Sequence, residues 1–205
     1  MGTRNLTMVL LNNEIKLAQY CQWDGYLEGQ GQEIVKFLKQ ENLDLEKFKK
    51  NIMRCKDISE KEHRALWKEL GADDSGFVSI EQSEKFKKKY PLLHRDAGSE
   101  ALQIINDSEG EGDIHISLLS DFIVDSLFCE WAYLIDLDNN NLEIYRGFQK
   151  EPLKEGERFY HLNEKSNGEY YPCSMVAKYS FSELTLETLP ELDKELHGDE
   201  DEEEE

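Results

Sequence analysis

The sequence lacks any apolar run long enough to cross a bilayer. The apolar stretch near its N-terminus, Met8–Leu11, is too short for the core of a secretory signal peptide. The four cysteines form no Cys-x-x-Cys pair, so neither a zinc site nor thioredoxin-type redox chemistry is indicated. They are Cys21, Cys55, Cys129 and Cys173. We therefore expect a cytoplasmic protein with reduced thiols and no membrane association.

Basic residues are also scarce. The chain has 24 Lys and Arg against 44 Asp and Glu, which gives a formal net charge of −20. So acidic a chain has no general basic surface, and we expect no direct binding to nucleic acid. The segment Gly198–Glu205 is almost entirely acidic and predicts a disordered tail. Most such tails remain solvated, although one can occupy a partner's basic surface as a nucleic-acid backbone does.

Signals for phosphate and metal binding are incomplete. Gly29-Gln30-Gly31 lacks the third glycine and the Lys-Ser pair of phosphate-binding loops. Residues 72–78 resemble the middle of an EF-hand loop, but Gly71 and Gln82 occupy its two key acidic positions. Residues 136–140 offer oxygen atoms in a hairpin turn without the closing glutamate. We therefore expect neither a metal ion nor a cofactor.

Alternating apolar residues predict an α+β fold. With 205 residues and 39% hydrophobic content, the chain can bury a core as one domain, residues 1–197. One hairpin is predicted around Asn12-Asn13, because Asn tolerates a positive φ, and a second around 138–141. With a C-terminal strand in Tyr171–Phe181, these hairpins predict a mixed or antiparallel sheet of about five strands with helices on one face.

Helices dominate the stretch between the two hairpins. Apolar spacing predicts a helix over Gln32–Gln40 and another over Leu43–Cys55. Ser59–Glu62 and Ser79–Gln82 have the form of capping boxes that begin two further helices. We interpret residues 43–108 as a mostly helical insertion, and expect another helix near 184–196.

Two segments resemble a family of microbial, phage and fungal proteins without an assigned function. They are the start, Met1-Gly2-Thr3-Arg4, and the turn Gln22-Trp23-Asp24-Gly25-Tyr26 with Gly29-Gln30-Gly31. Later blocks at 95–98 and 125–133 are also similar, so the resemblance covers about residues 1–150. Leu27 stands where the family usually has proline. The resemblance implies a shared architecture and no particular reaction.

Polar and aromatic residues collect at the predicted ends of strands and helices, where loops on a rigid sheet carry function. The candidate ligand-binding residues are Arg4, Trp23, Asp24, Tyr26, Arg95, Asp96, Asp125 and Glu130. The two arginines would hold a small anionic or amide ligand, while the aromatic rings stack on it. Alternatively, the arginines pair with these acids and tie the lobe to the sheet. The primary hypothesis is a binding or interaction protein whose recognition surface includes the Trp23–Gly31 turn.

Two other functions remain open. A small hydrolase or transferase would use Asp24 or Glu130 as a base near Cys21 or Thr3. In an amino-terminal-nucleophile enzyme, however, Gly2 would come first after removal of Met1, and it has no nucleophilic side chain. An acidic inhibitor would instead present its tail to a basic protein.

Overall fold

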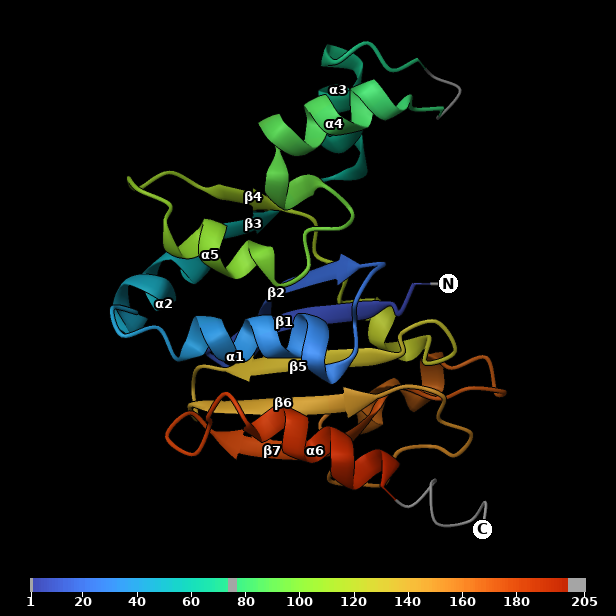
Figure 1. Ribbon diagram of the computed structural model, residues 1–205. Helices are drawn as coiled ribbons and strands as arrows, with labels where there is room; N and C mark the ends of the chain where they lie inside the picture. The colour runs from blue at the N-terminus through green and yellow to red at the C-terminus, as the bar shows by residue number, and fades with distance from the viewer. Residues whose placement is uncertain (1, 74–76, 199–205) are drawn as a thin grey trace.

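The structure is a computed structural model that describes residues 2–73 and 77–198. Its centre is a five-stranded mixed sheet in the order β2-β1-β5-β6-β7 (Figure 1). β1 pairs antiparallel with β2 and parallel with β5, and the remaining neighbours are antiparallel. The predicted α+β class is confirmed. The strands are β1 Asn5–Leu11, β2 Glu14–Cys21, β5 Trp131–Asp136, β6 Asn141–Arg146 and β7 Ser174–Ser180.

Helices cover one face of this sheet (Figure 1). Val9 and Ile135 point to that face and pack with apolar residues of four helices. All seven residues of β1 are buried, because the strand has a partner on each side and a layer on each face. The helix predicted over Gln32–Gln40 is present, but it ends two residues earlier, at Leu38. The four helices are α1 Gln32–Leu38, α2 Leu45–Met53, α5 Glu100–Asn106 and α6 Thr188–His197.

The opposite face is covered by irregular chain rather than by long helices. Leu6 and Met8 point to this face and pack with Ile123 and Phe159. Ile123 lies in the 3₁₀ turn η3 Ser120–Val124, and the connection between β6 and β7 contains a second one, η4 Tyr160–Lys165. The connection between β6 and β7 thus covers a second core, and we call this connection the lid.

The segment between the hairpins divides into two parts. α2 and α5 pack into the main core, whereas α3 Glu60–Glu69 and α4 Ile80–Lys89 stand away from the sheet beyond β2 (Figure 1). The two predicted capping boxes are confirmed, with Ser59 and Ser79 as N-caps. A small parallel sheet of β3 Cys55–Asp57 and β4 Ile114–Ile116, together with η2 Pro91–Leu93, connects this helical pair to the rest. Of the predicted acidic tail, residues 199–205 lie outside the described residues.

Candidate functional site

One end of the sheet carries exposed aromatic side chains from three separate segments. β1 and β5 begin at this end, and β2 and β6 finish there, as their pairing requires. Trp23 follows β2, Phe128 precedes β5 and Phe148 follows β6. With Tyr26, these rings are 44–53% exposed. We call these four residues, together with Arg4, the aromatic end of the sheet.

The Trp23 turn is held by backbone hydrogen bonds and closely packed glycines. Gly25 N–H donates to the carbonyl of Thr3 at 2.9 Å, and Gln30 N–H donates to that of Asp24 at 2.7 Å. A Cβ atom on Gly29 would lie 2.1 Å from the carbonyl oxygen of Asp24, so only glycine fits there. Gly29 lies in the short segment η1 Leu27–Gly31, where its own backbone is not helical and kinks the chain. The turn therefore presents Trp23 and Tyr26 from a rigid base.

Arg4 and Glu130 meet on one side of this turn. The carboxylate of Glu130 accepts the backbone N–H of Arg4 at 3.1 Å, and the carbonyl of Arg4 accepts the N–H of Glu130. The guanidinium of Arg4 lies 4.7 Å from the ring centre of Phe128. Asp125 is exposed and lines a cavity of about 440 Å³ with Phe128 and Tyr170. Arg4 and Glu130 are thus held in place, while Asp125 keeps a solvent-facing carboxylate.

Arg95 and Asp96 contact the turn from its other side. The carboxylate of Asp96 accepts the backbone N–H of Gln22 at 3.2 Å. Arg95 donates to the side-chain oxygen of Gln22 and lies over the ring of Tyr20. Arg4, by contrast, contacts Phe128 and Glu130, which precede β5. The predicted site residues therefore form two groups that flank the Trp23 turn, and their role in binding remains a prediction.

The cysteine thiols are poorly placed for catalysis. All four are buried. Burial raises the pKa of the Cys21 thiol, raises that of Cys129 well above its ordinary value, and raises that of Cys55 to about 12. Because a nucleophilic cysteine must ionise, these thiols do not favour the cysteine version of the hydrolase hypothesis.

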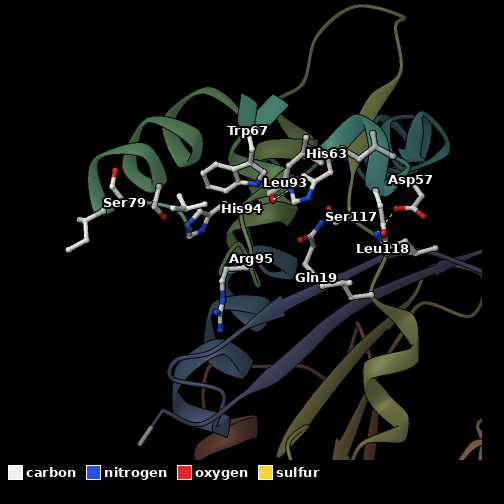
Figure 2. Close-up of a pocket in the computed structure, with 16 residues that line it drawn as sticks. Gln19, Asp57, His63, Trp67, Ser79, Leu93, His94, Arg95, Ser117 and Leu118 are labelled. Carbon is white, nitrogen blue, oxygen red and sulfur yellow. Dashed lines mark hydrogen bonds between the residues drawn. The ribbon is translucent and has the colours of Figure 1, made fainter. Parts of the chain in front are cut away.

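A cleft between the helical pair and the edge of β2 was not predicted from the sequence. Its volume is about 820 Å³, and Figure 2 shows side chains of the lobe and of β2 facing it. Gln19 of β2 forms its floor, and Trp67 of α3 belongs to its opposite wall. No local pattern predicts the cleft, because its lining residues come from five distant segments.

A buried charge network under the lid was also missed. Arg158 donates to Asp136 at 2.7 Å and to both carboxylate oxygens of Glu143 at 2.8 Å. Asp136 and Glu143 are 0% and 3% exposed, and Lys178 and Tyr145 also contact Glu143. Burial raises the pKa of each carboxyl, but the hydrogen bonds, including those from Arg158, outweigh it and leave both pKa values lowered. The negative charges of Asp136 and Glu143 are balanced by the positive charges of Arg158 and Lys178. This balance indicates that the network has a structural role, which we call the Arg158 clamp.

Other features give no further sign of chemistry. Throughout residues 2–73 and 77–198, no group of three or more His, Cys, Asp or Glu side chains could hold a metal ion. No helix in that part of the chain is long and apolar enough to cross a membrane.

No protein-family model matches the sequence, and no curated protein or solved structure is significantly similar to it. The resemblance noted above therefore stays a prediction.

Proposed function

We propose that the protein is an interaction protein that binds a basic polypeptide segment at the aromatic end of its sheet. The observation that carries the proposal is the gathering of four half-exposed aromatic side chains from three segments. Trp, Tyr and Arg are the residue types that most often dominate the binding energy of protein interfaces. The net charge of −20 would attract a basic partner and repel an acidic one.

Backbone conformation at the same place supports a functional constraint. Asp24 and Phe148 both have positive φ angles, 54° and 58°, and each adjoins a glycine. An aromatic residue rarely adopts this region, and doing so costs about 1–3 kcal/mol. The strained backbone turns Phe148 outward, where it stays 53% exposed. The exposed carboxylate of Asp125 lies nearby, since Phe148 N–H bonds to Ser126, and it would pair with a basic side chain of the partner.

We place this activity in the cytoplasm, because four free and buried thiols suit a reducing compartment.

An array of 15-residue peptides that vary in charge and aromatic content tests the binding. Basic peptides should bind best, and Trp23→Ala or Phe148→Ala should weaken that binding about tenfold. Met53→Ala is the matched control, since Met53 is 45% exposed beside the opposite, Asn12 end of the sheet. A preference for acidic peptides, or equal binding by the wild type and both aromatic variants, would refute the proposal.

A further inference from the structure

The cleft beside β2 has the dimensions of a small-molecule site. Its volume of about 820 Å³ lies within the range of about 300–1,000 Å³ typical of ligand pockets. It lies where the helical pair meets the sheet, and such junctions are common places for ligand sites. Apolar side chains line much of it, with a few polar groups between them. The apolar ones are Ile58, Trp67, Val78, Ile80, Leu93, Leu118 and Leu119.

One wall offers a rigid aromatic surface. The ring of Trp67 stacks on that of Phe86, with ring centres 3.8 Å apart and planes 8° from parallel. Phe86 is fully buried, so it fixes the tryptophan ring from behind. Two other apolar side chains of the lining, Ile80 and Leu119, are 82% and 42% exposed. A bound apolar ring would cover surface that the free protein leaves in water.

Among the polar groups that line the cleft, His94 and Gln19 offer a neutral donor and a neutral acceptor. His94 Nδ1 accepts the backbone N–H of Asp96 at 3.2 Å, which leaves the ring proton on Nε2. Burial lowers the pKa of His94, so the ring is uncharged at neutral pH. Gln19 is 2% exposed, and its Nε2 donates to the carbonyl of Leu92 at 3.1 Å. That bond sets the amide so that Oε1 remains an acceptor, and none of the described residues donates a hydrogen bond to it.

The charged residues around the cleft already have partners. Arg95 lies 3.6 Å from Asp96 and Glu60 lies 3.5 Å from Arg64, so these two charges are matched by opposite ones. Asp57 accepts the backbone N–H of Leu118 at 2.8 Å, which does not neutralise its charge. An anion would therefore find no unpaired positive charge among these three residues, and a cation would meet only the exposed carboxylate of Asp57.

We infer that the cleft binds an uncharged aromatic molecule that carries an amide or an equivalent N–H and C=O pair. The carbonyl of this ligand accepts from His94 Nε2, its N–H donates to Gln19 Oε1, and its ring packs beside Trp67 and Leu93. This site is separate from the proposed peptide surface and does not depend on it.

Three probes of equal size and different charge test the inference. They are 2-naphthamide, 2-naphthoate and 2-naphthylmethylamine, titrated into the full-length protein and followed by amide ¹H–¹⁵N NMR. The naphthamide should bind about tenfold more tightly than either charged probe and should shift resonances of cleft residues. His94→Phe should weaken it about threefold to tenfold, the effect of one neutral hydrogen bond.

Substitution at the mouth gives a test that does not threaten the core. Ile80→Glu places a charge on an exposed position of the cleft and should reduce naphthamide binding at least fivefold. Met53→Glu, at a half-exposed position outside the cleft, and Trp23→Ala, at the aromatic end, should leave it unchanged. Tighter or equal binding of a charged probe, shifts that map elsewhere, or unchanged binding to Ile80→Glu would each overturn the inference.

Discussion

The carboxylate of Asp96 accepts the backbone N–H of Gln22 across a distance of 3.2 Å, 74 positions apart in the chain. This bond, with that from Gly98 N–H to the carbonyl of Tyr20, fastens the loop after η2 to the end of β2. The same loop carries His94 into the cleft. Asp96 is therefore a fixed point between the helical pair and the Trp23 turn.

Asp96→Ala should lower the free energy of unfolding by about 1 kcal/mol, because the backbone N–H of Gln22 loses its acceptor. Asp96→Asn is the matched control, since its side-chain oxygen can still accept this bond. Urea denaturation measures both variants. Equal destabilisation by Ala and Asn would mean that the negative charge, rather than the hydrogen bond, is what the fold requires.

Gly29→Ala should destabilise the protein by about 1–3 kcal/mol, the usual cost of overpacking. The added Cβ would lie 2.1 Å from the carbonyl oxygen of Asp24, which the turn cannot move without losing its bond to Gln30. Gly112→Ala provides the comparison, because a Cβ there meets nothing within 4 Å. Thermal unfolding should separate the two. If Gly29→Ala unfolds at the same temperature as the wild type, the turn is more adaptable than its geometry implies.

Arg158→Met should cost about 3–5 kcal/mol, because it leaves Asp136 and Glu143 buried without their guanidinium partner. Lys165→Met should change stability by about 1 kcal/mol or less, since its ion pair with Asp121 is solvent-exposed. Both changes remove one positive charge, so urea denaturation at one pH compares them directly. Similar effects would contradict the assignment of Arg158 as the central clamp.

The same network sets the acid stability of the protein. The carboxyl pKa values of Asp136 and Glu143 are lowered in the folded state. Their contribution is therefore complete above the ordinary values of 3.8 and 4.5, and is lost as the pH falls through the lower folded-state values. In Arg158→Met, burial acts without the guanidinium, so the loss should begin at a higher pH. Urea denaturation between about pH 2 and 7 tests this; identical pH profiles would exclude the coupling.

The thiols should react slowly with iodoacetamide at pH 8 in the native protein and rapidly in urea. Cys21, Cys55 and Cys129 have raised pKa values because burial disfavours their thiolates. Mass spectrometry of the alkylated protein counts the modified sites over time. A single cysteine that reacts quickly in the native state would revive the hydrolase hypothesis.

Local patterns predict the two hairpins, the capped helices and the α+β class. Leu6, Met8 and Leu10 alternate with Thr7, Val9 and Leu11, which indicates a strand buried on both faces, and β1 is such a strand. The parallel pairing of β1 with β5 cannot be predicted from local patterns, because nothing in the sequence of either strand indicates which strand it will pair with. The three-residue strands β3 and β4 are too short to show a period.

The candidate sites show the same limit. The sequence identifies Trp23 and Arg95 as residues at the ends of helices or strands. It does not indicate that Arg95 contacts Gln22 beside the turn. Glu143 lies in a predicted strand and Arg158 in a polar connection, so nothing local indicates that they pair. Phe128 and Phe148 belong to no sequence motif. They become candidates for a binding surface only because the sheet brings their loops to one end, where both side chains are exposed.

The position of β1 between β2 and β5 also determines the order of events during synthesis. The β1–β2 hairpin is complete once residue 21 leaves the ribosome, but Glu130, which binds Arg4, lies 126 positions after Arg4 in the chain. Until then the second edge of β1 has no partner, although all of its residues are destined for the core. The nascent chain thus holds an apolar, unpaired strand edge while more than half of the protein is translated, and this edge is open to intermolecular pairing until β5 emerges.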